Sequence, residues 1–218
     1  MDNQMTEQKK IFLQSEGNAW FNRNKKTLAE KSLPDQDRIL PDLLELPLHP
    51  NMKVLEIGCG SGNRLVWLKE NLELECSGID PSAQAIEVAR SRGIDAYQGT
   101  ADSLPFATAS FDLVIFGFCL YLCDRTDLFQ ISQEADRVLK TQSWLAILDF
   151  FTPTPLSRPY HHFLGISSYK MDCRTLFDWH PAYICMTHKV RDHVENTYTD
   201  EAQNWVSLSI FRKSSFEL

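Results

Sequence analysis

The feature that most constrains this chain is a glycine cluster between two apolar segments. Residues 54–62 read Val-Leu-Glu-Ile-Gly-Cys-Gly-Ser-Gly, and the ten residues that follow place leucines at helical spacing. The run 52–57 is short, apolar and β-prone, and it stops at the glycines. Glycine lets a backbone turn tightly and lets a ligand approach closely. The pattern therefore predicts a strand, a glycine turn that binds a ligand, and a helix.

The same alternation continues along the chain. Further strands are expected at 74–79, 94–99, 111–118 and 144–150, and helices at 82–92 and 124–140. Pro81 is expected in the first turn of the first of these helices, and Asp124 is expected to cap the second. Residues 111–118 are continuously apolar, as in a parallel strand that is covered on both faces. Strands alternating with helices predict a doubly wound, Rossmann-like α/β sheet, whose ligand lies at the carboxyl ends of the strands.

The chain is predicted to form a single domain, residues 1–218, with a seven-stranded sheet and helices on both faces. Its parts are a helical lead-in or lid, a cofactor-binding core, an acceptor-side insertion and a terminal antiparallel strand pair, at 1–46, 47–150, 151–181 and 182–218. Within the lead-in, residues 36–46 have the pattern of a helix. The three prolines of 151–159 are expected to prevent any regular element there.

Composition excludes several classes of protein. Hydrophobic residues make up 43% and charged residues 23% of the 218, which rules out wholesale disorder. A formal net charge of -7 argues against a general nucleic-acid binder, because that affinity comes from clustered Lys and Arg. No apolar run is long enough to span a bilayer, and residues 1–15 have no signal-peptide core. We therefore expect a cytoplasmic protein without a nucleic-acid partner, and self-association as a homodimer is left open.

The glycine turn differs from a dinucleotide fingerprint. That fingerprint is G-x-G-x-x-G, whereas this turn has G-x-G-x-G with Asn63 at the sixth position. Glu56 stands two residues before Gly58, where a carboxylate repels a pyrophosphate and attracts an ammonium group. The turn therefore suits a cationic cofactor without phosphate.

The segment VLEIGCGSG, followed by GIDPS, resembles motif I and the second-strand acid of class I methyltransferases that depend on S-adenosylmethionine (SAM). The resemblance implies that Glu56 holds the methionine portion of SAM, directly or through water. It implies that Asp80 binds both ribose hydroxyls, since one carboxylate accepts two hydrogen bonds, and that Pro81 touches the adenine face. Asp102 then accepts from the adenine amino group.

The other residues that the resemblance assigns to SAM lie in the glycine turn, in the loop after the third strand and at the end of the fourth strand. They are Gly58, Cys59, Gly60, Gly62, Ala101, Ser103, Phe116 and Gly117. Taken alone, Cys59 also fits a small buried thiol, and Asp102 also fits a turn cap.

The flanking segments TEQKKIFLQSEGNAWFNRNK and YHHFLGISSYKMDCRTLF are similar to those of bacterial methyltransferases associated with surface-polysaccharide or sugar biosynthesis. This resemblance implies that 17–24 and 160–172 form a lid and an acceptor pocket. His161 or His162 would then act as general base. The candidate substrate residues are Trp20, Arg23, Asn24, Tyr121, Tyr160, Tyr169 and Lys170. Alternatively, the aromatic residues only pack a helix against the sheet.

The two adjacent histidines do not predict a metal site, because neighbouring side chains usually point apart and no second ligand pair accompanies them. The sequence thus predicts SAM-dependent methyl transfer, as O-methylation, to a small molecule or a glycan precursor. The alternatives are an NAD(P)-dependent oxidoreductase and a catalytically silent, methyltransferase-like binding protein. An RNA or protein methyltransferase is disfavoured by the acidic balance and by IFGF at the fourth strand, where such enzymes carry an N-P-P-Y-like motif.

Overall fold

The computed structural model describes residues 7–30 and 32–215 of the chain. Positions 1–6 and 31 of the predicted lead-in, and positions 216–218 of the predicted terminal segment, lie outside the described residues.

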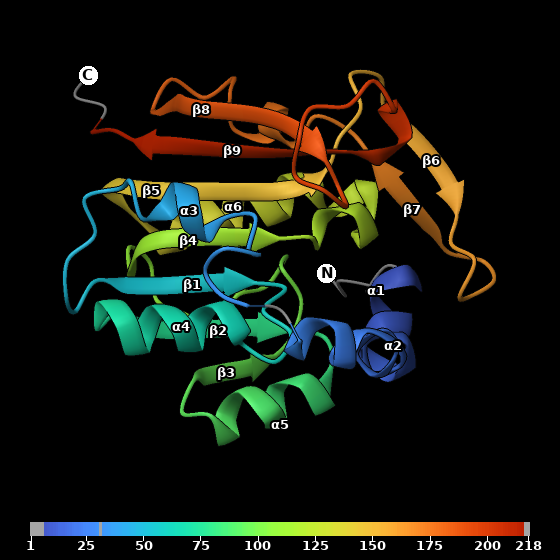
Figure 1. Cartoon of the computed structure of the whole chain (residues 1–218), viewed down its shortest axis with the longest axis horizontal. Helices are drawn as coiled ribbons and strands as arrows, with labels where there is room; N and C mark the ends of the chain where they lie inside the picture. The colour runs from blue at the N-terminus through green and yellow to red at the C-terminus, as the bar shows by residue number, and fades with distance from the viewer. Residues whose placement is uncertain (1–6, 31, 216–218) are drawn as a thin grey trace, which may run out of the picture.

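A seven-stranded sheet with the order β3-β2-β1-β4-β5-β9-β8 forms the centre of the molecule (Figure 1). Its strands are β1 Lys53–Ile57, β2 Glu75–Asp80, β3 Asp95–Gln98, β4 Phe111–Gly117, β5 Leu139–Phe150, β8 Tyr183–Asp192 and β9 Trp205–Lys213. The first five are parallel, β9 is antiparallel to β5, and β8 is antiparallel to β9. The predicted sheet with its terminal antiparallel pair is confirmed.

Helices cover both faces of this sheet. In Figure 1, α3 Leu40–Leu43, α4 Asn63–Leu72 and α5 Ala83–Ser91 lie on the near face, and α6 Leu128–Val138 lies on the far face. The apolar run of β4 serves both layers. Leu113 and Ile115 join one hydrophobic cluster, and Val114 and Phe116 join the other, because side chains alternate along a strand. The prediction of helices on both faces is confirmed.

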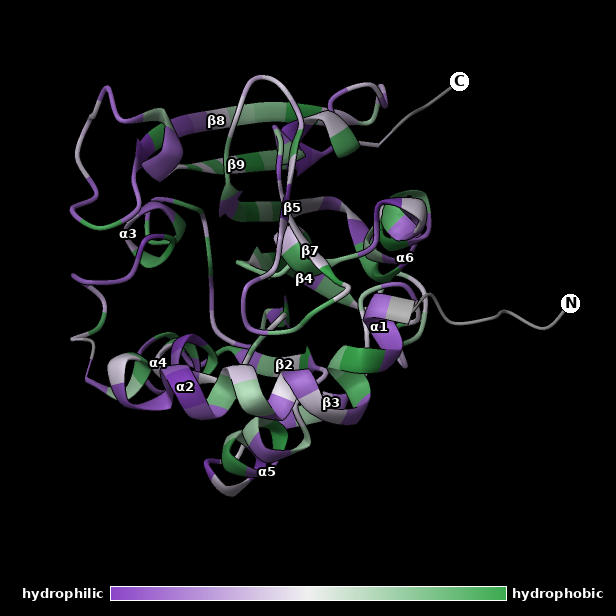
Figure 2. Ribbon diagram, turned by 90° about the vertical axis from the view of Figure 1, so that its right-hand side faces the viewer, coloured by the Kyte–Doolittle hydropathy of each residue, from purple (hydrophilic) through white to green (hydrophobic). Residues whose placement is uncertain are grey.

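The carboxyl ends of the parallel strands are covered by the N-terminal helical segment. It consists of α1 Glu7–Ile11, the five-residue π-helix η1 Phe12–Glu16, and α2 Gly17–Ala29. Figure 2 looks onto this side of the molecule, with α1, α2 and β7 in front of the strand ends. We call α1, η1 and α2 together the lid. Among the described helices, none is long and apolar enough to cross a membrane.

Short 3₁₀ turns complete the connections. They are η2 Leu120–Leu122, η3 Arg125–Asp127, η4 Cys173–Leu176 and η5 Ala202–Asn204.

Several predicted boundaries are wrong. The helix predicted at 36–46 is only the four-residue α3. Pro81 precedes α5, which is capped by Ser82 through a hydrogen bond from the backbone N–H of Ala85. Asp124 makes no side-chain cap, since the backbone N–H of Lys9 donates to its carboxylate at 3.2 Å, and η3 separates it from α6.

The proline-rich stretch also differs from the prediction. Leu156–Pro159 forms strand β6, which pairs antiparallel with β7, Ser167–Lys170. Pro159 is tolerated because it stands at the end of a two-stranded sheet, where it does not have to donate to a ladder on both sides. The resulting hairpin stands beside the lid at the strand ends (Figure 1).

Candidate functional site

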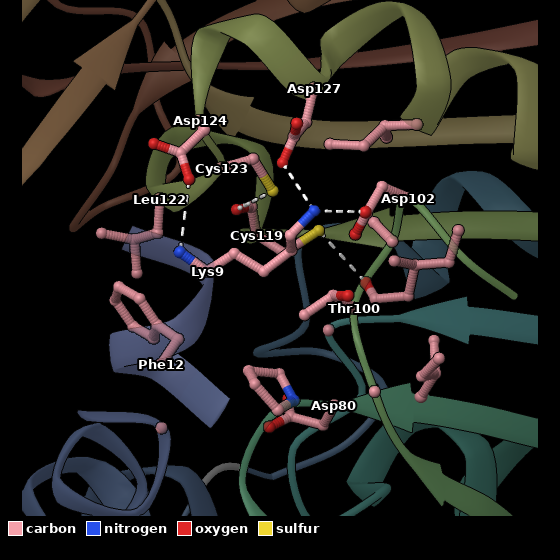
Figure 3. Close-up of a pocket in the computed structure, with 18 of the residues that line it drawn as sticks. Lys9, Phe12, Asp80, Thr100, Asp102, Cys119, Leu122, Cys123, Asp124 and Asp127 are labelled. Carbon is pink, nitrogen blue, oxygen red and sulfur yellow. Dashed lines mark hydrogen bonds and ion pairs between the residues drawn. The ribbon is translucent and has the colours of Figure 1, made fainter. Parts of the chain in front are cut away.

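A cleft of about 850 Å³, including its open mouth, lies at the carboxyl ends of β1, β2 and β4 and under the lid (Figure 3). Its lining residues come from the lid, from the strand ends and from the segment 117–131. A concavity therefore lies at the strand ends, where parallel-sheet topology predicts a ligand.

The glycine turn and Asp80 form one hydrogen-bonded unit at the floor of the cleft. Gly60 donates its N–H to Oδ2 of Asp80 at 2.9 Å, and Ser82 donates its N–H to Oδ1 at 2.8 Å. Gly58 has φ +79°, and a Cβ there would stand 2.6 Å from the Cβ of Cys119, so only glycine fits. Each Asp80 oxygen keeps a second lone pair, so the carboxylate can accept two further donors.

Burial raises the pKa of Asp80 to about 6, and the two backbone N–H groups oppose this rise. Asp80 is therefore mostly ionised at neutral pH. A carboxylate held in this way suits the two adjacent hydroxyls of a ribose.

Glu56 does not line the cleft. It is 3% exposed and forms an ion pair with Arg64, which also donates from Nη2 to Asp37 at 2.9 Å. A Cβ at Gly117 would stand 2.8 Å from Oε1 of Glu56, so this carboxylate lies directly behind the glycine wall. Its Oε2 has no hydrogen-bond partner among the described residues. Burial raises its pKa to about 7, although Arg64 acts to lower it.

Asp102 is already paired in the structure. Nζ of Lys9, from α1, lies 2.5 Å from Oδ2 of Asp102 and 3.1 Å from Oδ2 of Asp127, inside the cleft (Figure 3). The pKa of Asp102 is lowered because this ion pair outweighs the effect of burial. Burial alone would lower the pKa of Lys9. Its two carboxylate partners, Asp102 and Asp127, outweigh burial and raise this pKa.

The residues predicted for SAM divide into two groups. Those that line the cleft are Gly58, Asp80, Pro81, Ala101, Asp102 and Gly117. Those behind or beside its wall are Glu56, Cys59, Gly60, Gly62, Ser103 and Phe116. Cys59 packs under Gly78, where a Cβ would stand 2.6 Å from its sulfur, and Phe116 is fully buried in the sheet core. These two side chains shape the floor without facing the cleft.

Most residues predicted for the acceptor bind one another instead. Trp20 lines the cleft and donates from Nε1 to the hydroxyl of Tyr121 at 3.1 Å. Arg23 pairs with Glu16 and donates to the hydroxyl of Tyr160 at 3.0 Å. That hydroxyl donates to Glu16, also at 3.0 Å. The network ties α2 to the loop after β6.

The other three predicted acceptor residues also lie off the cleft lining. Asn24 donates to the backbone carbonyl of Trp20 at 2.8 Å. The guanidinium of Arg125 stacks on Tyr169 at 4.3 Å, and Lys170 donates to the backbone carbonyl of Gln203.

His161 and His162 are exposed in the loop between β6 and β7, and neither lines the cleft. Their ring centroids are 3.9 Å apart, so the expectation that they point apart is wrong. The described residues contain no cluster of three or more His, Cys, Asp or Glu side chains arranged to hold a metal ion.

Sequence reasoning missed several cleft residues. Gly99 and Thr100 follow β3, and Phe118 and Cys119 follow β4, so position directly after a strand would have found them. Phe118 has φ +54°, a conformation costly for a bulky residue and often found at functional sites. Lys9 carried no comparable signal.

Part of this chain is similar in sequence to known methyltransferases. Residues 54–142 match the sequence model of the family described as a methyltransferase domain. The demethylmenaquinone methyltransferase of Thermotoga maritima is 36% identical over 117 residues, which cover 51% of this chain and 49% of that enzyme. The chain spans about half the length of the curated relatives it matches.

Solved structures resemble nearly the whole chain. The complex between the Trm112 methyltransferase activator of Haloferax volcanii and a protein described as a methyltransferase gives a TM-score of 0.74 at 16% identity. The match covers 94% of this chain and 99% of the matched one. The 1,6-didemethyltoxoflavin-N1-methyltransferase of Burkholderia thailandensis, solved with bound S-adenosylhomocysteine (SAH), gives 0.69 at 13% identity and covers 94% of this chain and 88% of the other. At these identities the likeness shows the fold alone. Residues 54–142 therefore match a methyltransferase-domain family, within a chain that has the Rossmann-like fold also seen in solved SAM-dependent methyltransferases.

Proposed function

We propose that this protein transfers the methyl group of SAM to a small-molecule acceptor. The observation that carries the proposal is Asp80 at the end of β2, oriented by the N–H groups of Gly60 and Ser82 and open to the cleft. A ribose is the part of SAM that such a carboxylate suits. The neighbouring wall is apolar at Ile79 and Pro81, as a purine face requires.

The charge of the site also fits SAM. Oε2 of Glu56 is a buried hydrogen-bond acceptor without a partner among the described residues. The Glu56 carboxylate lies behind Gly117, at the wall of the cleft near the glycine turn. It would attract the ammonium group of the methionine portion electrostatically, from behind the wall of the cleft. The family match over 54–142 supports the same cofactor class.

When bound, SAM supplies a methyl group that is already activated by its sulfonium. The chain then has to orient the acceptor in line with the carbon–sulfur bond and to exclude water. Such positioning contributes on the order of 7 to 11 kcal/mol in favourable cases. The lid performs the exclusion, since Phe12 and Trp20 both face the cleft.

We place the acceptor beside the apolar side chains of the cleft. Trp20, Phe118 and Leu122 line it. We infer an acceptor with an apolar or aromatic face, a class that is compatible with the quinone-type substrate in the name of the Thermotoga maritima relative. The glycan-precursor acceptor and O-methylation, predicted from the flanking segments, are the alternative. Homodimer formation and a cytoplasmic location stay predictions.

Two measurements test the function. In isothermal titration calorimetry we expect binding of SAM and SAH and no binding of NAD. The buried carboxylate of Glu56, behind Gly117, would repel the pyrophosphate of NAD. The second measurement is transfer of label from methyl-labelled SAM to apolar ring compounds and to sugar nucleotides. Binding of NAD without SAH would favour the oxidoreductase, and SAH binding without transfer to any of these compounds would favour a silent binding protein.

A further inference from the structure

We propose that Lys9 occupies the base subsite of the cofactor cleft and exchanges partners when the cofactor binds, leaving Asp102 and remaining paired with Asp127. The inference rests on the proposed function, because it assumes that the ligand is a nucleoside with a ribose on Asp80. It adds a gating residue in the lid.

The position of Asp102 follows from the sheet. Strand β2 ends at Asp80, which pairs in register with Gln98 at the end of β3, and Asp102 comes four residues after Gln98. A nucleoside whose ribose binds Asp80 therefore extends its base along the loop after β3. Asp102 is the carboxylate of that loop which faces the cleft. It is the natural acceptor for an amino group on the base.

Lys9 now fills that position. Its Nζ contacts Asp102 at 2.5 Å and Asp127 at 3.1 Å, and its side chain is 9% exposed. An amino group of the base and this ammonium group would therefore compete for the same carboxylate oxygens. Because Asp127 lies on the other side of Nζ, the ammonium can give up Asp102 without being left unpaired in the cleft (Figure 3).

The lid is built so that such a shift is local. Lys9 belongs to α1, and the π-helix η1 separates α1 from α2. A π-helical turn in an otherwise α-helical segment marks a weak point of the helix and is frequent at functional sites. α2 itself is fixed to α5, since Ser82 and Gln84 both donate to Oδ1 of Asn18 at 2.9 and 3.1 Å. Movement of Lys9 can thus leave α2 in place.

The test is calorimetric titration of the full chain with SAH and SAM. Lys9→Met removes the competing charge and keeps the length of the side chain, so we expect the Kd for SAH to fall about tenfold, or about 1.4 kcal/mol. SAM should gain at least as much, because a cation leaves a cleft that receives a sulfonium. Lys10→Met is the matched control, since Lys10 is exposed on the same helix, and its Kd should stay within twofold of wild type.

A double-mutant cycle tests the exchange itself. Asp127→Asn leaves Lys9 with Asp102 as its carboxylate partner at Nζ, so the Kd for SAH should rise about fivefold in the wild-type background and stay unchanged in Lys9→Met. Asp127 makes no side-chain cap on α6, so this change removes no helix cap. Lys9→Gln replaces Lys9→Met if the latter does not fold.

The outcomes separate the two proposals. An unchanged or higher Kd in Lys9→Met, or an equal effect of Asp127→Asn in both backgrounds, overturns the exchange. Absence of SAH binding to the wild-type protein overturns the proposed function instead.

Discussion

Replacing Asp80 by asparagine tests the cofactor site at the residue on which it depends most. The substitution keeps the shape of the side chain and removes its charge. In the structure, one oxygen accepts from Gly60 N at 2.9 Å and the other from Ser82 N at 2.8 Å. The amide of asparagine must place an NH₂ group against one of these donors. It also offers a single neutral acceptor to the ribose.

The magnitude follows from the bonds that change. Hydrogen bonds to charged groups contribute about 1.5 to 3 kcal/mol each, and neutral ones about half as much. Two ribose hydroxyls therefore lose about 2.8 kcal/mol together, which raises the Kd for SAH about 100-fold. Folding should change less, because the misplaced NH₂ group is offset by removal of a buried charge whose desolvation raises the pKa to about 6.

The matched control is Asp112→Asn. Asp112 is the second residue of β4, at the end away from the cleft, where it accepts from Lys53 N at 2.9 Å and pairs with Lys140 at 2.8 Å. This change should lower stability by about 1 kcal/mol and leave the Kd for SAH unchanged. Titration calorimetry measures both variants, with circular dichroism to verify their folding. A Kd for Asp80→Asn within threefold of wild type would refute the reasoning.

Three further predictions concern pH, the turn and the lid. Since burial raises the pKa of Asp80 to about 6, lowering the pH from 7.5 to 5 should raise the Kd for SAH about tenfold. The same shift means that the ligand-free protein loses stability as pH rises from about 4 to 6, because the folded state holds this proton more tightly. Gly58→Ala should lower the free energy of unfolding, measured with urea, by about 2 to 4 kcal/mol, because its Cβ would stand 2.6 Å from a side chain. Gly60→Ala should lower it by about 1 kcal/mol, because its Cβ would have no atom within 4 Å. Equal losses would contradict the assigned turn. Tyr160→Phe should lower the free energy of unfolding by about 1 to 2 kcal/mol, because buried Glu16 loses a hydrogen-bond donor at 3.0 Å. The affinity for SAH should stay the same. A loss of affinity would show that the lid network reaches the cofactor.

The strand ends of the cleft could be read from the sequence because a parallel sheet brings its carboxyl ends to one edge. Glycine spacing and the acid after the second strand therefore located Gly58 and Asp80. The lid could not be read in the same way. Lys9 meets Asp102 across 93 residues of sequence, and no periodicity encodes such a contact. The hairpin of 156–170 was missed because its prolines were read as breakers, although an isolated two-stranded sheet tolerates one at a strand end.

The polar lid residues show why acceptor chemistry was harder to predict than cofactor chemistry. Glu16 is 3% exposed, and a carboxylate buried to that degree is stable only with partners. Arg23 and Tyr160 are those partners, so turning either one toward an acceptor would leave a buried charge underpaired, at a cost of about 3 to 5 kcal/mol. An acceptor hydrogen bond contributes only about 0.5 to 1.5 kcal/mol net. Glu16, Arg23 and Tyr160 therefore remain bonded to one another, and in the proposed function the acceptor is selected by the apolar side chains of Trp20 and Phe118, which line the cleft.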